Sequence, residues 1–283
     1  MGHTLIFNVS MAVASIVWLL FAAKIIFCFK TCVREYNESA VTGCIYCAFT
    51  VLMMIITPWY AQWFPTGAQA AHYTAAVLHK LMVLLFTWRY VVQGINWDTF
   101  VPTWFVPYVG VLISNVVGAQ LFIPLWPTVI LIYGVGIYWI ILVFMVARLC
   151  KRRIPEFARH SRAVMVAPAS LCVIAYINVV SSPNMHLLWL FYTVMLVNLA
   201  YVVGCMPLFF SVPFSPGFAA LTFPMAASTL ASFRMADVLF DEGYMAVHSV
   251  VFQLAGIQMY ITTAIIAFVL GGFGRMAFRS LLN

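Results

Sequence analysis

Charged side chains are the scarcest feature of this chain: Asp, Glu, Lys and Arg make up 7% of its 283 residues, whereas hydrophobic residues make up 65%. A soluble globular domain carries about 25% charged residues. So low a charge content excludes a fold that is exposed to water on all sides. It predicts an all-α, polytopic membrane protein whose residues 1–283 form a single transmembrane domain.

Acidic residues are especially few, and all seven can be placed outside the membrane core. They fall in predicted loops, at Glu35, Glu38, Asp98, Glu156, Asp237, Asp241 and Glu242. A carboxylate inside the membrane is the usual mark of a proton relay or a cation pathway. Its absence argues against a cation channel, and it weakens a proton-coupled carrier without excluding one.

Motifs for other chemistry are also missing. We find no nucleotide-binding motif and no soluble domain, so ATP-driven transport is not expected. Cys44 and Cys47 have the spacing of a metal or redox pair, but no His or acidic residue completes a set, so neither a metal nor a cofactor is expected. An enzyme would need a convergent cluster of His, Asp, Glu or Cys, and the acidic loop around Asp237 is better explained as a solvated loop.

What is present is a series of apolar stretches long enough to cross a bilayer, which takes about 20 residues. Nine stretches qualify, at about 5–29, 40–62, 70–93, 104–124, 127–149, 164–182, 185–210, 215–234 and 244–272. The first is too long for a signal peptide and is expected to be a retained span. These stretches predict about nine transmembrane helices in the lipid bilayer.

The basic residues set the expected orientation. With the N-terminus outside and the C-terminus cytoplasmic, eleven Lys and Arg residues fall in inside loops, and Arg234 alone falls outside. This asymmetry obeys the positive-inside rule, so the formal charge of +7 is a topology signal and not a nucleic-acid surface. We expect a bacterial-type inner membrane or a plasma membrane, with the loop from Arg148 to Arg162 facing anionic lipid headgroups.

Three prolines recur about 60 residues apart, each early in every second span: Pro107, Pro168 and Pro224. Proline removes a backbone donor and bends a helix. The recurrence predicts stacked hairpins in which kinked inner helices line a central pore and straight helices lie outside. The alternative is that these prolines are simply tolerated, as prolines often are in membrane helices.

Residues 213–233 form the most informative stretch. They predict an apolar helix with the pair Phe223-Pro224 near its middle, followed by small residues at 226–229. In lipid, a bent helix is tolerated mainly where protein or water covers the break. A bulky ring at such a bend is a candidate pore plug, although Phe223 could also be an ordinary core residue.

This stretch closely resembles the ninth helix of the tellurite-resistance/dicarboxylate transporter family, which includes the plant slow anion channels. Residues 162–176, with the phrase Val-Ala-Pro-Ala, resemble the family's seventh helix, and residues 105–115 are similar to its fifth. The resemblance implies ten helices in five hairpins around a pore, a homotrimer with one pore per subunit, and Phe223 as the occluding residue. By this comparison the family's first helix is expected to be absent here.

The remaining candidate residues follow from the predicted pore. Hydroxyl and amide groups can donate hydrogen bonds to an anion without trapping it, although they can equally hold helices together. The candidates on predicted pore-facing helices are Thr50, Ser114, Asn115, Asn178, Thr222, Ser228 and Thr229. Lys80 is expected about 14 Å from the cytoplasmic end of its span, too deep to reach water easily, and could attract an anion.

We therefore expect passive or gated passage of small anions. The resemblance implies inorganic anions, C4-dicarboxylates such as malate, or tellurite-type oxyanions as substrates. The alternative is a proton-coupled carrier of dicarboxylates or sulfite.

Overall fold

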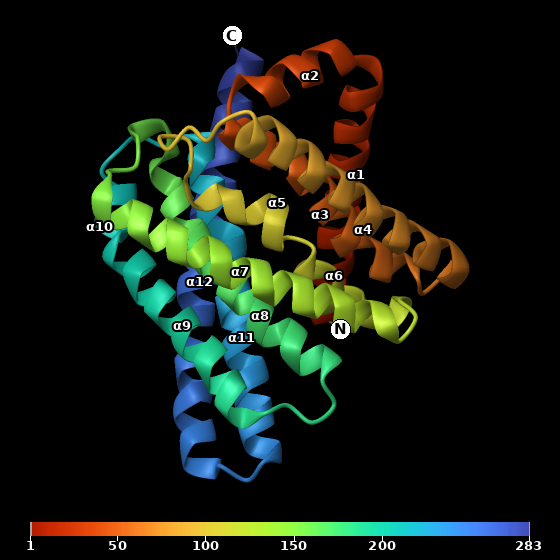
Figure 1. The fold of residues 1–283 in the computed structure, drawn as a ribbon, viewed down its shortest axis with the longest axis vertical. Coiled ribbons are helices and arrows are strands. Elements are labelled where there is room, and N and C mark those ends of the chain that lie inside the picture. Colours follow the sequence, from red (N-terminus) through yellow and green to blue (C-terminus); the bar gives the residue numbers. More distant parts are fainter. Residues whose placement is uncertain (1, 283) are drawn as a thin grey trace. The chain divides into compact units, whose positions relative to one another are not determined.

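The computed structural model describes residues 2–282, and every regular element in that range is a helix (Figure 1). The chain divides into two compact units, Met1–Arg148 and Leu149–Asn283. Together with the long apolar helices, this confirms an all-α, polytopic membrane protein. That the whole chain acts as one transmembrane domain stays a prediction.

The first unit is built mainly on the hairpin of α3 and α4, against which α6 and the shorter helices pack. Its helices are α1 (Gly2–Phe27), α2 (Phe29–Glu38), α3 (Ala40–Tyr60), α4 (Pro65–Thr87), the π-helix η1 (Trp88–Val92), the 3₁₀ helix η2 (Pro102–Trp104), α5 (Phe105–Val109), α6 (Leu112–Gly118), the 3₁₀ helix η3 (Ala119–Leu121) and α7 (Leu125–Lys151), whose last three residues belong to the second unit.

The second unit is built around α8, which packs against α9 and α11, while α11 pairs with α12. Figure 1 shows α11 and α12 as an antiparallel hairpin. The helices are the 3₁₀ helix η4 (Glu156–Met165), α8 (Val166–Val179), α9 (Met185–Gly204), α10 (Met206–Phe209), the 3₁₀ helix η5 (Pro216–Leu221), α11 (Thr222–Asp241) and α12 (Met245–Leu282). Every residue of α8 from Val166 to Tyr176 is buried, which explains why this helix is apolar on all sides.

All nine predicted stretches contain helix. In the described part of the chain, seven helices are long and apolar enough, or eight if the bent pair Pro102–Val109 and Leu112–Leu121 counts as one span. The stretch predicted at 215–234 is not among these helices. It divides into η5 and α11, and α11 is less apolar because it carries Arg234 and two aspartates toward its end.

Two predicted boundaries were wrong by a wide margin. The stretch predicted at 185–210 ends as α9 at Gly204 and resumes as the short α10, because Pro207 lies in the first turn of a new helix. The stretch predicted at 244–272 continues to Leu282. With 38 residues, α12 is about 57 Å long at 1.5 Å per residue, well beyond a hydrocarbon core of about 30 Å.

The amphipathic helix α2 is fastened to its neighbours by one carboxylate. Lys24 of α1 forms an ion pair with Glu35 at 2.6 Å, and the Tyr46 hydroxyl of α3 donates a hydrogen bond to the same Glu35 oxygen at 2.5 Å. Tyr90 also donates a hydrogen bond to the main-chain carbonyl of Tyr36. Lys24, which lies near the end of the span predicted at 5–29, thus has a partner within the protein.

These contacts predict a pH dependence for the docking of α2. The hydrogen bonds from Lys24 and then Tyr46 hold the pKa of the Glu35 carboxyl below its ordinary value. Because this pKa is lower in the folded state, the contacts of Glu35 stabilise the docked helix fully at pH values above the ordinary pKa. That stabilisation is lost as the pH falls through the lowered pKa of the folded state. Hydrogen exchange of the α2 amides should therefore accelerate on acidification, and Glu35→Gln should remove that acceleration. Unchanged exchange across this pH range in wild-type protein would contradict the assignment.

Candidate functional site

The three recurring prolines occupy one and the same local position. Pro107, Pro168 and Pro224 are each the third residue of an α-helix that directly follows a 3₁₀ helix, namely α5 after η2, α8 after η4 and α11 after η5. Proline is tolerated in the first turn because its missing N–H would have no intrahelical partner there. Each proline thus follows a change from 3₁₀ to α geometry. That these positions kink helices lining a pore stays a prediction.

A sharp bend lies just beyond Pro107. The two halves of the broken pair, Pro102–Val109 and Leu112–Leu121, meet at 63°. The break falls at Gly110 and Val111, one turn after the proline. Pro107 therefore lies in the first turn of α5, and the bend itself lies at the residues that follow.

Phe223 is the second residue of α11, and the prediction that it lies near the middle of a helix was wrong. The preceding residues Pro216–Leu221 are a 3₁₀ helix, so the α-helix begins only at Thr222. The Phe223 side chain is 40% exposed, whereas Leu221 and Met225 on either side are buried. Thr222 donates a hydrogen bond to the Ala219 carbonyl at 2.8 Å, which fixes the backbone just before the ring.

The predicted pore-lining hydroxyls of α11 bond to their own helix. Ser228 and Thr229 are buried, and both donate to the Met225 carbonyl at 2.9 Å. Thr229 also lies 3.0 Å from Thr262 of α12. Only the contact between Thr229 and Thr262 joins two helices, as the alternative of a structural role expects. A contact of either hydroxyl with an anion stays a prediction.

A polar seam between α11 and α12 escaped the sequence analysis. We define it as Thr229, Ser232, Gln258 and Thr262, all of them buried. Ser232 donates to the Gln258 side-chain oxygen at 3.0 Å and accepts from Tyr192 of α9 at 3.2 Å. Spacings of three or four residues place the seam on one face of each helix. The spacing can be seen in the sequence, but the sequence does not show which helix packs against these residues.

Asn178 lies at the end of α8, where Arg234 of α11 donates a hydrogen bond to its side-chain oxygen at 2.9 Å. Arg234 is the one basic residue that the sequence analysis placed outside the membrane. The structure thus joins a predicted pore-lining amide to this cation at one end of the second unit.

In the first unit, Thr50 pairs with a buried histidine. The Thr50 hydroxyl of α3 lies 2.7 Å from Nδ1 of His79 on α4, and Nε2 of the same ring lies 2.9 Å from the Pro107 carbonyl. A carbonyl only accepts, so Nε2 carries a proton, while the Thr50 hydroxyl that lies against Nδ1 also donates to the Cys47 carbonyl at 2.8 Å. The pair joins three helices around the first half of the broken span.

The same arrangement repeats two turns along the hairpin. The Thr57 hydroxyl lies 2.6 Å from Nδ1 of His72, whose Nε2 lies 3.4 Å from the Ser114 carbonyl. Both histidines are fully buried. We call Thr50–His79 and Thr57–His72 the two histidine clamps, because each ring reaches a different half of the bent pair.

Two glycines allow the clamps to approach the broken helix. A Cβ at Gly118 would lie 2.7 Å from the His72 ring, and one at Gly110 would lie 3.2 Å from the His79 ring. A side chain at Gly118 would displace the His72 ring, whereas one at Gly110 would first meet the Val106 carbonyl, at 2.3 Å.

The other predicted residues of the first unit are also engaged. Ser114 donates to the Val111 carbonyl at 2.7 Å, and Asn115 donates to the Pro127 carbonyl at 2.8 Å. The Lys80 ammonium lies 2.8 Å from the centroid of the Tyr133 ring, a cation–π contact with α7. Whether Lys80 attracts anions stays a prediction.

The part of the chain that the structure describes contains no group of three or more His, Cys, Asp or Glu residues that could hold a metal ion. All seven cysteines are free thiols.

Comparison with known proteins identifies the family of this chain. A family model described as voltage-dependent anion channel matches residues 2–273. No curated protein matches the chain. The matched range covers nearly the whole sequence. It confirms the family resemblance inferred from the proline-containing segments 105–115 and 162–176 and from the pair Phe223-Pro224. The chain therefore belongs to the voltage-dependent anion channel family, and it is a multi-pass integral membrane protein of anion transport.

Proposed function

We propose that this protein lets small anions cross the membrane passively, or under a gate, along a path that Phe223 occludes. The family match over residues 2–273 carries this proposal. The proposed substrates are inorganic anions, C4-dicarboxylates such as malate, and tellurite-type oxyanions. We further propose a homotrimer with one path per subunit, an external N-terminus and a cytoplasmic C-terminus, in a bacterial-type inner or plasma membrane.

The distribution of charge supports an anion path. The acidic residues of this chain lie in loops or near helix ends, so the apolar spans bring no carboxylate to the membrane interior. The polar groups on the proposed path are hydroxyls and amides, which bind anions weakly enough for release. Lys80 adds a cation within α4 that could raise the local potential for an anion.

The position of Phe223 supports its role as the occluding residue. Phe223 is 40% exposed, although Leu221 and Met225 are buried, so its ring is not enclosed in the core of its own unit. Pro224, which follows it, fixes the direction in which the helix leaves the 3₁₀ segment. Small residues follow the ring along α11, at 226–229.

The two buried histidines give the alternative, a proton-coupled carrier, one observation in its favour, since ionisable groups within spans can carry protons. Reconstituted liposomes separate the two functions. We expect chloride, nitrate, malate or tellurite to move down its own gradient with no pH gradient imposed, above the leak of empty liposomes. Movement that occurs only with a pH gradient, and that runs uphill, would overturn passive passage in favour of the coupled carrier.

A further inference from the structure

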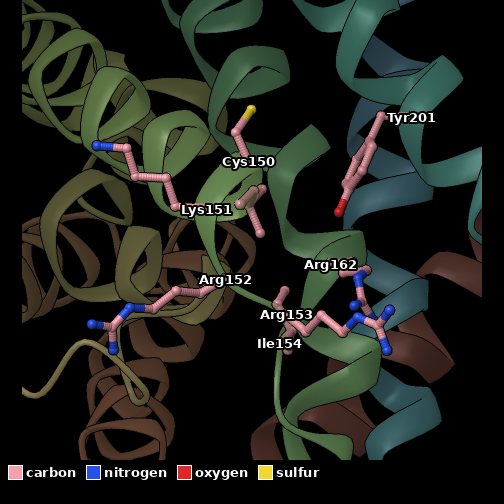
Figure 2. A pocket seen from close by; sticks show the side chains of 8 residues that line it. Cys150, Lys151, Arg152, Arg153, Ile154, Arg162 and Tyr201 are labelled. Atoms are coloured by element: carbon pink, nitrogen blue, oxygen red, sulfur yellow. The ribbon is translucent and has the colours of Figure 1, made fainter.

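The second unit contains a cavity of about 350 Å³ at the end of α7 (Figure 2). It is lined by Leu149, Cys150, Lys151, Arg152, Arg153, Ile154, Arg162 and Tyr201. The first six continue from the last turn of α7 into the following loop, Arg162 lies on η4, and Tyr201 lies on α9. Its size is at the lower end of the range for small-molecule sites, which is about 300–1,000 Å³.

The lining is strongly positive. Four of the eight lining residues are Lys or Arg, and none is acidic. The nearest acidic residue along the chain, Glu156, forms an ion pair with Arg159 at 3.0 Å instead. Within residues 2–282, Arg153 and Arg162 form no ion pair. Like charges that share a cavity repel one another, and a bound anion would relieve that repulsion.

Three of the lining side chains point to a common place. In Figure 2, the Arg153 and Arg162 side chains end on the same side of the cavity, and the Tyr201 hydroxyl points toward them. Tyr201 lies close enough to Arg162 for the two side chains to interact. Lys151 and Arg152 extend toward the opposite side of the view. The cavity thus has one converging group of donors and two cations that point elsewhere.

The chemistry of these donors selects the ligand. A guanidinium group presents paired N–H donors that match the oxygens of a phosphate, and a phenol adds one further donor. A phosphate monoester carries nearly two negative charges near neutral pH, enough to pair with both arginines. Chloride or nitrate would satisfy far fewer of these donors.

The surroundings favour a lipid as the source of the phosphate. The cavity begins where the apolar span of α7 ends, and basic residues just beyond a span attract anionic headgroups. Apolar side chains of Leu149 and Ile154 line it beside the cations. Phe157, close by along the chain, is exposed, as expected for a side chain that enters the lipid interface.

We propose that Arg153, Arg162 and Tyr201 form a binding site for a phosphate monoester, with the headgroup of an anionic lipid such as phosphatidic acid as its source. The site lies outside the proposed anion path, and its occupancy does not depend on transport. Direct binding can therefore be measured whether or not the protein conducts anions.

The test uses the full chain in nanodiscs of neutral phosphatidylcholine. In one arm, phosphatidic acid with a pyrene label is added to the bilayer, and binding is followed by energy transfer from tryptophan. In the other arm, glycerol 3-phosphate is added to the buffer, and binding is followed by calorimetry. Specific binding of phosphatidic acid alone assigns the site to a lipid, whereas matching binding of glycerol 3-phosphate assigns it to a soluble monoester.

The variants remove equal charge from the two sides of the cavity. We expect Arg153→Gln with Arg162→Gln to weaken binding of the phosphate monoester by at least about tenfold, because charge-assisted hydrogen bonds are lost. The matched control, Lys151→Gln with Arg152→Gln, should change it by less than about threefold, as expected for screened surface charges. Tyr201→Phe should weaken binding while helical content stays that of wild type, which guards against a variant that merely misfolds.

Equal losses in the two double variants would overturn the site in favour of a diffuse basic surface. Absence of specific binding by the folded wild-type chain in both arms would overturn it as well. Neither result would bear on anion passage, which the liposome measurements test separately.

Discussion

Phe223→Ala is expected to raise anion flux through reconstituted protein by at least about tenfold, which corresponds to a barrier lower by about 1.4 kcal/mol. The reason is that the substitution removes a ring from the start of α11, where the proposed path is narrowest, and leaves the Pro224 backbone in place. The ring is 40% exposed, so its loss should cost less stability than the roughly 3–5 kcal/mol of a buried Phe. The measurement is the initial rate of chloride or nitrate efflux from liposomes at equal protein content.

The matched control for this substitution lies on the same helix. Phe240 is also an exposed aromatic of α11, but it is at the opposite end, where it contacts His248. Phe240→Ala should leave flux within about twofold of wild type, since an exposed contact far from the path alters neither the barrier nor the fold much. Equal flux in wild type and Phe223→Ala, with both proteins folded, would refute the gate.

His79→Ala is expected to destabilise the protein by about 2–4 kcal/mol. The substitution leaves a cavity in a fully buried site, and it removes the donor to the Pro107 carbonyl at 2.9 Å and the partner of Thr50 at 2.7 Å. Loss of the clamp frees the first half of the bent pair, so the change should appear as a lower midpoint of unfolding in detergent. The exposed His186 gives the control, since His186→Ala should stay within about 0.5 kcal/mol of wild type.

A double-mutant cycle separates the hydrogen bond from the cavity. Thr50→Val removes the hydroxyl and keeps the shape of the side chain. If the clamp exists, the Thr50→Val and His79→Ala effects should fall short of additivity by about 0.5–1.5 kcal/mol, within the range seen for hydrogen bonds between membrane helices. Strict additivity would show that the two side chains do not interact.

Much of the fold could be predicted because apolar length and proline position are local properties. Each of the nine apolar stretches contains helix, and the recurring prolines do mark equivalent places in three of them. The change from 3₁₀ to α geometry at those prolines was not predicted. The chain around Pro168 could bend as one helix, or it could change from a 3₁₀ segment to an α-helix just before the proline. Both geometries use the same sequence, so hydrophobicity could not distinguish one from the other.

The candidate site was harder to predict because its polar contacts join distant parts of the chain. Thr57 and His72 lie on opposite arms of a hairpin, and only the register of α3 against α4 brings them to 2.6 Å. Gln258 and Ser232 meet for the same reason in the second unit. By contrast, Ser228 and Thr229 bond within their own turn of α11, a local bond that a hydroxyl can make in any helix.

The claim that this protein conducts anions is tested most directly by the reversal potential of the current through Phe223→Ala protein in a planar bilayer. With unequal concentrations of potassium chloride on the two sides and equal pH, we expect a reversal potential close to the equilibrium potential of chloride. A reversal potential at the equilibrium potential of potassium would contradict it.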